Sequence, residues 1–258
     1  MISKFKTLIW LLKRTSYWRH TLSLIFRKFY PNKDSPALRD QATKWAASNS
    51  VSVKEALKLI GLLPEDNNLD IKLSEALIKQ AKSLADKSKV KMGGAGDLDL
   101  LYSASKLSNA KKILETGVAY GWSSMAILAS ISNKEDAKLI SIDMPYPKMN
   151  NEEFVGVVVP DSYRDKWELI REPDRNGIKK ALIKFGGTID LCHYDSDKSY
   201  YGRLYAYPIL WNALNNGGVF ISDDIQDNLA FKEFVESRGL NFAVTKCEGK
   251  YIGLVFKK

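Results

Sequence analysis

The chain has 258 residues, of which 39 are Lys or Arg and 30 are Asp or Glu, so its formal net charge is +9. A hydrophobic fraction of 45% and a charged fraction of 27% are ordinary for a globular protein with a sizeable core. The first 31 residues hold seven Lys or Arg and no acidic residue, which leaves 32 basic and 30 acidic residues in the remainder. A nearly neutral body without a base-reading motif argues against nucleic acid as a partner.

Residues 1–31 form a basic arm in which the spacing predicts two short amphipathic helices. Apolar residues follow the i, i+3, i+4, i+7 pattern of one helical face twice. These residues are Phe5, Leu8, Ile9 and Leu12, then Leu22, Ile25, Phe26 and Phe29. Such helices pack on their own fold or a sister subunit, or lie on an anionic membrane surface. Both interpretations stay open, so a homo-oligomer and a peripheral membrane contact through residues 1–31 are the expected kinds of partner.

No stretch of the arm is long enough to cross a bilayer, because residues 7–12 give a charge-free run of only six and a span needs about 20. Lys13 and Arg14 also interrupt the apolar core that a secretory signal would need. The only cysteines are Cys192 and Cys247, which fits a reducing compartment. We therefore expect a cytoplasmic protein, with the inner membrane surface as the alternative location.

A polar segment bounded by two prolines, residues 31–36, separates the arm from a helical lead-in. Helices are predicted over 37–47, 53–60 and 73–87, and a further helix, capped by Asp97, runs to Leu107. The glycine-rich residues 91–96 interrupt this pattern. The expected division is a basic arm (1–31), a helical lead-in or cap (32–96) and a catalytic domain (97–258).

From residue 111 onward, short apolar runs alternate with helical stretches, the pattern of a parallel sheet with crossover helices. Strands are predicted at 112–116, 138–143, 167–171, 189–194, 218–222, 242–246 and 251–256. The last two are joined by only four residues, which suits an antiparallel hairpin. The predicted fold class is α/β, a Rossmann-like, seven-stranded, mostly parallel sheet with one antiparallel edge strand.

Ligands of open α/β sheets bind beyond the carboxyl ends of the strands. After the first predicted strand, Gly117 and Gly121 permit a tight turn, and Ser123 and Ser124 lie in the first turn of the next helix, where a carboxylate can be received. Asp143 closes the second strand, where a carboxylate can accept hydrogen bonds from both ribose hydroxyls. Together these residues indicate a cofactor that carries a nucleoside, and the absence of GxGxxG disfavours a dinucleotide.

Two further strand ends carry aspartates. Asp195 follows one apolar strand, and Asp223 and Asp224 follow the next. Neighbouring parallel strands lie about 5 Å apart, so the three carboxylates could converge on one hard cation. Capping of the following helices is the alternative interpretation.

Four segments in this order, ILETGVAYGWSS, LISIDMP, IDLCHYDSDKSYY and LNNGGVFISDDI, resemble class I S-adenosylmethionine-dependent methyltransferases. The pattern is similar to the branches with a DSDHSY-like motif after the fourth strand, and to the metal-dependent catechol and macrocin type O-methyltransferases. The resemblance covers residues 101–256 and leaves the first 90 residues unexplained.

The resemblance implies a role for each motif residue at the cofactor. Glu115, Gly117 and Gly121 would shape the pocket for the methionine part of S-adenosylmethionine, Ser123 would hold its carboxylate, and Asp143 would bind the ribose. Asp195 also belongs to the implied cofactor-binding set.

The resemblance also implies a metal and a base. Asp195, Asp223 and Asp224 match the metal-ligand positions, with Mg²⁺ as the expected ion, and Asp195 and Lys198 would be catalytic. Lys198 stands where the catechol type has a lysine base and the DSDHSY branch a histidine. Because an unperturbed lysine has a pKa near 10.4, it would need desolvation or a cation to act as a base, and an ion pair with Asp197 is the alternative.

The expected activity is S-adenosylmethionine-dependent O-methylation of a small-molecule or glycan hydroxyl, assisted by a divalent metal. The alternative is a catalytically silent methyltransferase-like protein that binds a membrane surface or a partner. His193 shares a strand face with Asp195 and is predicted to be a core histidine. The apolar connection 144–160 is a candidate lid over the substrate.

Overall fold

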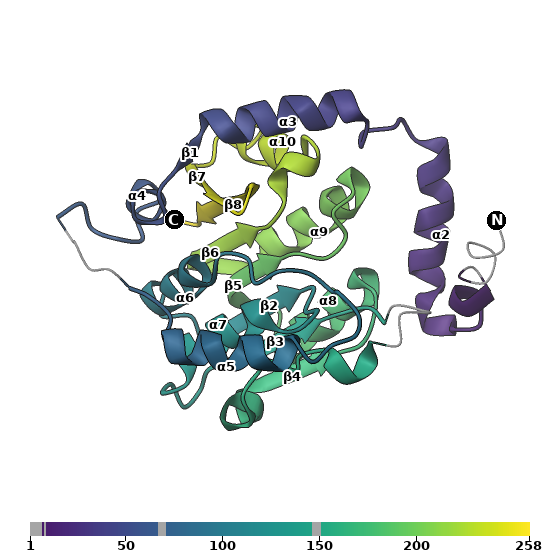
Figure 1. The fold of residues 1–258 in the computed structure, drawn as a ribbon. Helices are drawn as coiled ribbons and strands as arrows, with labels where there is room; N and C mark the ends of the chain where they lie inside the picture. Colours follow the sequence, from purple (N-terminus) through teal and green to yellow (C-terminus); the bar gives the residue numbers. More distant parts are fainter. Residues whose placement is uncertain (1–6, 8, 67–70, 146–150) are drawn as a thin grey trace.

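The structure is a computed structural model that describes residue 7 and residues 9–66, 71–145 and 151–258 (Figure 1). Its centre is an eight-stranded sheet in the order β1-β7-β8-β6-β5-β2-β3-β4. The strands are β1 (Ser50–Val51), β2 (Lys112–Thr116), β3 (Lys138–Ile142), β4 (Trp167–Ile170), β5 (Ile189–Tyr194), β6 (Leu214–Ser222), β7 (Phe242–Cys247) and β8 (Lys250–Phe256). All seven predicted strands are present, and the Rossmann-like α/β class is confirmed.

Two features of the sheet differ from the prediction. β8 is the reversed strand, but it lies between β6 and β7 and pairs antiparallel with both, so the prediction of an antiparallel strand at the sheet edge is wrong in position. The eighth strand, β1, adds parallel to β7 and forms the edge instead. The sequence around Ser50 and Val51 carries no strand signal, because two residues are too short for an alternating pattern.

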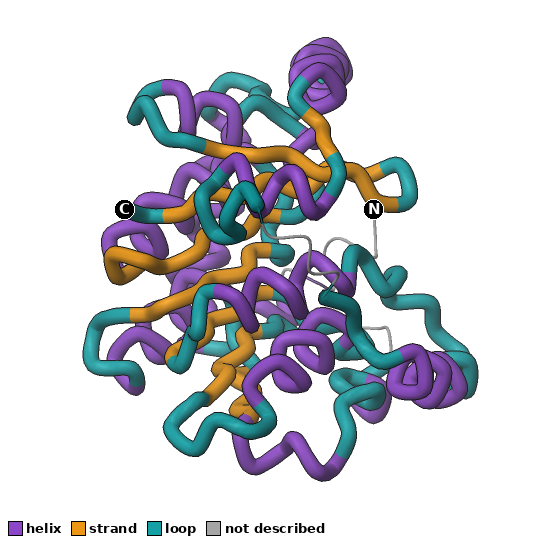
Figure 2. Tube along the Cα trace, turned by 90° about the vertical axis from the view of Figure 1, so that its left-hand side faces the viewer, coloured by secondary structure: helices purple, strands orange, loops and turns teal. Residues whose placement is uncertain are grey.

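Helices lie on both sides of the sheet (Figure 2). They are α2 (Trp18–Phe26), α3 (Pro36–Ser48), α4 (Val53–Leu59), α5 (Glu75–Ala85), α6 (Leu98–Leu107), α7 (Trp122–Ile131), α8 (Asp174–Lys184), α9 (Tyr200–Ala213) and α10 (Ala230–Glu236). Side chains of Ser35, Ser52 and Ser199 cap α3, α4 and α9. Asp97 caps α6 by accepting a hydrogen bond from the Leu100 amide at 3.0 Å, as predicted.

Alternating strand residues divide the core into two layers. Ile113 of β2 and Leu191 of β5 pack with α4, α5, α6 and α7 on one face of the sheet. The next residues along, Leu114 and Cys192, pack with α3, α8, α9 and α10 on the other. Because both faces are covered, these strands read as continuous apolar runs in the sequence.

The lead-in helices belong to this core. Leu57 of α4 and Ala81 of α5 are buried in the first layer, and Ala46 of α3 in the second. Their predicted ranges are confirmed to within two residues. The division of the chain at residues 31 and 96 stays a prediction.

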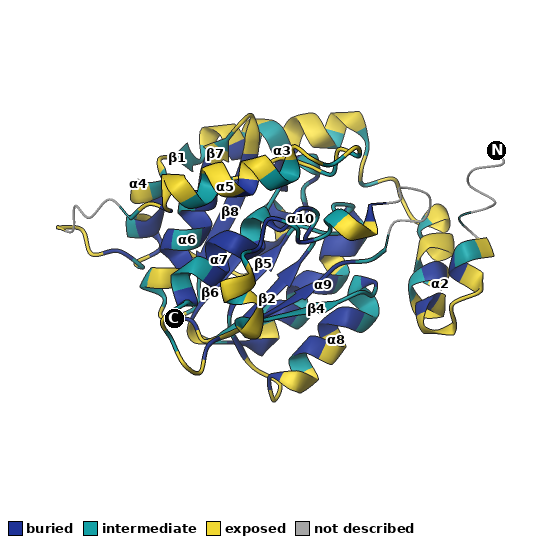
Figure 3. Cartoon of the chain, turned by 60° about the horizontal axis from the view of Figure 1, so that its bottom comes forward, coloured by how far each residue is buried: buried dark blue, intermediate teal, exposed yellow. Residues whose placement is uncertain are grey.

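The arm contributes α2, which stands at one side of the body (Figures 1 and 3). Residues 9–12 are helical as well, whereas Phe5 and Leu8 of the predicted first face lie outside the described residues. None of the helices in the described ranges is long and apolar enough to span a membrane.

Candidate active site

A cavity of about 560 Å³ opens at the carboxyl ends of β2, β3, β5 and β6. β2 and β5 are adjacent, but the chain leaves β2 toward β3 on one side and β5 toward β6 on the other, so the cavity lies where the strand order reverses. Six of the predicted site residues line it. They are Gly117, Ser123, Asp143, Asp195, Lys198 and Asp223.

The sheet itself fixes the acidic residues. The amides of Asp143, Asp195 and Asp223 each donate to a carbonyl of the neighbouring strand, at 3.0, 2.9 and 3.0 Å. The hydrogen-bond ladder thus extends one residue beyond each strand, and the side chains project from its end. Strand pairing therefore brings together carboxylates that are up to 80 residues apart in the chain.

The glycine turn lies directly beside the Asp195 strand end. Gly117 has φ +83°, and a Cβ atom added there would overlap the backbone carbonyl of Asp195. Gly121 precedes α7. A Cβ atom added to Gly121 would lie 2.9 Å from the Cα of Gly156, so the Gly156 backbone leaves no room for a side chain there. Ser123 lies in the first turn of α7 and faces the cavity, whereas Gly121 does not line it.

Glu115 supports the site from beneath. It is completely buried and accepts hydrogen bonds from the hydroxyls of Ser124 and Ser141 at 2.5 and 2.6 Å. It is not among the residues that line the cavity. Its side chain therefore joins β2, β3 and α7, and its predicted contact with the cofactor stays a prediction.

Asp143 lines the cavity with a side chain that is only 4% exposed. One carboxylate oxygen accepts a hydrogen bond from the Val118 amide at 3.1 Å, and the other is paired with Arg171. Burial raises the pKa of Asp143, and the positive charge of Arg171 opposes that rise. The turn after β2 and the end of β4 thus orient this carboxylate.

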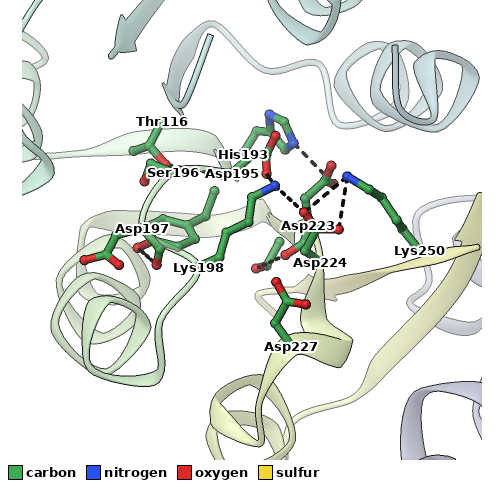
Figure 4. A network of polar contacts seen from close by, with 12 residues as sticks. Thr116, His193, Asp195, Ser196, Asp197, Lys198, Asp223, Asp224, Asp227 and Lys250 are labelled. Atoms are coloured by element: carbon green, nitrogen blue, oxygen red, sulfur yellow. Dashed lines mark hydrogen bonds and ion pairs between the residues drawn. The ribbon is translucent and has the colours of Figure 1, made fainter. Parts of the chain in front are cut away.

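Lys198 connects the two aspartate strand ends (Figure 4). Its ammonium group lies 2.9 Å from Oδ1 of Asp195 and also pairs with Asp224, while Lys250 approaches Asp224 at 3.3 Å. Burial lowers the pKa of Lys198, but the two carboxylates outweigh it and raise the pKa above the ordinary value. Lys198 is therefore an ammonium at neutral pH. The alternative pairing with Asp197 is wrong, because Asp197 pairs with Arg27 at 2.7 Å.

His193, which was predicted to be a core histidine, also contacts two carboxylates of the site. Its Nε2 lies 3.5 Å from Asp223 and its Nδ1 lies 3.4 Å from Glu115, and the ring borders the cavity. Burial disfavours its charge, yet the two carboxylates raise the pKa of His193 to about 10. An imidazolium therefore bridges the floor of the site. The available sequence signal was its position two residues before Asp195 on the same strand face.

The residues of the predicted metal site do not fit a divalent ion in this arrangement. Lys198 and Lys250 supply the positive charge beside Asp195 and Asp224, and His193 supplies it beside Asp223. Within the described ranges, no group of three or more His, Cys, Asp or Glu side chains is arranged to hold a metal ion. The prediction of a Mg²⁺ site therefore gains no support.

Sequence reasoning missed much of the cavity wall. The glycine-rich residues 91–96 and the hairpin at 247–250 face the strand ends, and Trp122 closes one side. The interruption of the helical pattern at 91–96 was the only signal for the first of these. Part of the candidate lid at 144–160, residues 146–150, lies outside the described ranges. Val158 and Val159 of the same connection are buried in the core.

Comparisons with known proteins agree with this geometry. Residues 114–225 match a protein-family model described as a methyltransferase domain. No curated protein matches the chain.

Three solved structures share the fold. The O-methyltransferase TomG from Streptomyces achromogenes, in complex with SAM, has a TM-score of 0.55 and 18% identity over 74% of this chain and 93% of its own. An O-methyltransferase from Bacillus cereus in complex with SAH gives 0.54 and 14% over 82% and 100%. The SAH-bound methyltransferase PaMTH1 from Podospora anserina gives 0.50 and 14% over 87% and 97%. Residues 114–225 thus match a methyltransferase domain, and the three neighbours share the fold of the chain, in agreement with the resemblance found in the sequence.

Proposed function

We propose that this chain transfers a methyl group from S-adenosylmethionine to a hydroxyl oxygen of a small-molecule or sugar acceptor. The observation that carries the proposal is one cavity that holds both parts of such a site. The Gly117 turn, Ser123 and Asp143 lie along it, and Asp195 and Lys198 lie at the adjoining strand end. Two of the three structural neighbours described above are named O-methyltransferases, which supports oxygen as the accepting atom.

The cofactor half of the cavity offers partners for the ribose and for the carboxylate of S-adenosylmethionine. Asp143 is placed for the ribose hydroxyls, since its carboxylate is held at the end of β3 by Val118 and Arg171. Ser123 and the amides at the start of α7 are placed for the carboxylate. The volume of about 560 Å³ is in the range of pockets that enclose a ligand of this size.

Transfer from a sulfonium is an in-line displacement. The bond between the methyl carbon and sulfur breaks with its electron pair moving to sulfur, a carbon–oxygen bond forms, and the hydroxyl proton must leave. Lys198, as an ammonium, donates a hydrogen bond to the acceptor oxygen and stabilises its developing negative charge. Asp195 accepts the proton; burial and the nearby charge of Asp223 raise its pKa to about 6. No step of this transfer requires a divalent ion.

Calorimetric titration with S-adenosylmethionine and S-adenosylhomocysteine tests the cofactor half. We expect micromolar binding by the wild type and a loss of at least about tenfold in Asp143→Ala, because hydrogen bonds to a charged group contribute about 1.5–3 kcal/mol. Asp161→Ala, at a fully exposed carboxylate, is the matched control. Undiminished binding by Asp143→Ala would refute the site assignment.

The transfer half is tested with labelled S-adenosylmethionine and a panel of phenolic, aliphatic and sugar hydroxyl acceptors. Methylation of one acceptor class that is abolished in Asp195→Asn, with cofactor binding retained, supports the proposed chemistry. Cofactor binding without transfer to any acceptor in the panel would favour the catalytically silent alternative.

A further inference from the structure

Helix α2 of the arm faces the body with its polar side. Just before α2, the Tyr17 hydroxyl donates to the Arg171 carbonyl at 3.2 Å; within it, Thr21 is 2% exposed; just after it, Arg27 pairs with Asp197 at 2.7 Å. In an ordinary surface helix the apolar stripe faces the protein and the polar side faces water. In α2 this arrangement is inverted.

The apolar side of the arm is consequently exposed. Leu22, Ile25, Phe26 and Phe29, the face predicted from the sequence, are 51%, 39%, 55% and 80% exposed. Of the twelve large apolar side chains that are exposed in the described ranges, nine lie between residues 9 and 30. Such a concentration on one segment marks a surface that another apolar phase covers.

A second cavity, of about 370 Å³, lies where this exposed side meets the body. Three cations line it: Arg19 from α2, and Arg175 and Lys179 from α8. Its remaining walls include Phe26 and Leu22, and no acidic side chain lines it. The cavity thus combines an anion-binding wall with an apolar rim.

Among these three cations, Arg175 is the one whose contacts the structure describes in most detail. Its guanidinium lies over the Tyr205 ring at 4.0 Å, and its buried Nε has no hydrogen-bond partner. Burial and the like charge of Arg27 lower its pKa, and the nearby Tyr205, Asp197 and Asp174 oppose this shift without cancelling it. Within the described part of the chain, none of the three cations forms an ion pair with a carboxylate.

We propose that residues 9–30 dock this protein on an anionic lipid bilayer, with a headgroup phosphate between Arg19, Arg175 and Lys179. Leu22, Phe26 and Phe29 would enter the boundary between headgroups and acyl chains. Guanidinium groups are suited to phosphate because their planar N–H donors match its oxygens. Residues 1–31 contain no acidic residue, so the whole segment complements a negative surface.

The same observations disfavour other occupants. A free phosphate would use the cations but leave the apolar rim exposed to water. A second copy of the arm would oppose like charges, which cost free energy at an interface. The lipid proposal does not depend on the proposed methyl transfer, so the two can fail separately.

Vesicle flotation of the full chain tests the docking. We expect the wild type to float with phosphatidylcholine–phosphatidylglycerol vesicles at low salt, and to remain unbound with phosphatidylcholine alone. The triple variant L22S/F26S/F29S should lose association at least about tenfold, since each buried CH₂ contributes about 0.8 kcal/mol. The matched control is I183S, which removes a 78% exposed apolar side chain of α8. Equal loss in I183S would overturn the proposal.

The phosphate contact is tested with R19E/K179E, compared with K79E/K87E, which makes the same charge change at exposed lysines in and just after α5. R19E/K179E should weaken binding to anionic vesicles at least about tenfold more than K79E/K87E, because the contribution of a basic residue to lipid binding depends on where it lies as well as on the net charge. Equal weakening would overturn the headgroup site. Melting temperature and S-adenosylmethionine binding of each variant confirm folding.

Two further measurements distinguish an anionic lipid surface from free phosphate and from a second copy of the chain as the occupant of this face. Inorganic phosphate that binds the protein while anionic vesicles do not would overturn the membrane proposal. A dimer in light scattering that L22S/F26S/F29S converts to a monomer, without any vesicle association of the wild type, would assign the face to a second copy instead.

Discussion

At the scale of single residues, Gly117 joins the turn after β2 to the Asp195 strand end. Its φ of +83° and the Asp195 carbonyl beside its missing Cβ both demand glycine. We expect Gly117→Ala to lower the free energy of unfolding by about 2–5 kcal/mol, combining left-handed strain and overpacking. Affinity for S-adenosylmethionine should fall at least about tenfold, because the backbone must shift at the cavity wall.

Gly187 provides a matched control for this prediction. Its φ is +89°, close to that of Gly117, but nothing lies within 4 Å of an added Cβ. Gly187→Ala should therefore show the strain alone, about 1–2 kcal/mol, with cofactor affinity unchanged. Urea unfolding and calorimetry measure both effects, and equal losses in the two variants would contradict the role of the Asp195 carbonyl.

The lysines of the aspartate network lead to a prediction about metal. Lys198 and Lys250 already neutralise Asp195 and Asp224. We expect no saturable Mn²⁺ binding by the wild type in calorimetry and no change in S-adenosylmethionine affinity after chelation. Lys198→Met removes one ammonium and should create weak Mn²⁺ binding, because carboxylates without a partner attract a hard cation. Tight Mn²⁺ binding by the wild type would contradict this view.

Individual site residues were predictable to the extent that their signals are local. Gly117, Asp143 and Asp195 each follow an apolar run, so the sequence places them at strand ends that line the cavity. The charge of His193 depends on Glu115, which is 78 residues away in the chain. Its state follows from the pairing of β2 with β5, which no local pattern encodes.

At the scale of elements, Asp174 at the start of α8 ties that helix to the turn after β5. Its carboxylate accepts a hydrogen bond from the Ser196 hydroxyl at 2.5 Å. Burial, with the nearby charge of Asp197, raises the pKa of Asp174 from its ordinary value of 3.8 to about 6. The folded state therefore binds a proton more tightly than the unfolded state.

The sign of the pH dependence follows from this shift. The stabilising contribution of Asp174 is complete below pH 3.8 and is lost as the pH rises through about 6. We expect Asp174→Asn, relative to the wild type, to gain about 2.5 kcal/mol between pH 4 and pH 7.5, since one pKa unit corresponds to about 1.4 kcal/mol and part of the shift lies below pH 4. Urea unfolding at both pH values measures the difference. A difference between Asp174→Asn and the wild type that is the same at both pH values would contradict the role assigned to Asp174.

Elements were predictable where they are long and periodic. The runs at 112–116 and 189–194 match β2 and β5 residue for residue, because both faces of these strands are buried. The place of β8 inside the sheet was not predictable from its hairpin with β7. That hairpin fixes the antiparallel pairing, but the choice of β6 as the second neighbour is a long-range contact.

At the scale of the whole molecule, the sequence revealed that the arm is amphipathic but left open which side it turns toward the body. The spacing of Leu22, Ile25 and Phe26 is the same whether that face is buried or exposed. Polar contacts decide the orientation, and they join residues more than 150 positions apart, such as Tyr17 with Arg171 and Arg27 with Asp197.

Arg27 is the polar anchor through which the arm reaches the motif after β5. Its guanidinium pairs with Asp197 at 2.7 Å and donates to the Ser199 hydroxyl at 2.8 Å, with a side chain only 14% exposed. Arg27→Met should remove about 1.5–3 kcal/mol from the docking of α2, the range for hydrogen bonds to charged groups. Amide exchange within α2 should accelerate about tenfold or more, since the helix opens locally rather than with the whole fold.

Two comparisons make this result specific. Arg39→Met breaks the ion pair between Arg39 and Asp227, but Arg39 is 61% exposed, so exchange in α2 should stay unchanged. Affinity for S-adenosylmethionine should also stay within about twofold in Arg27→Met, because neither Arg27 nor Asp197 lines the large cavity. If exchange in α2 is unaffected by Arg27→Met, the arm is held by Tyr17 and Thr21 instead, and its docking is independent of the motif that carries Lys198.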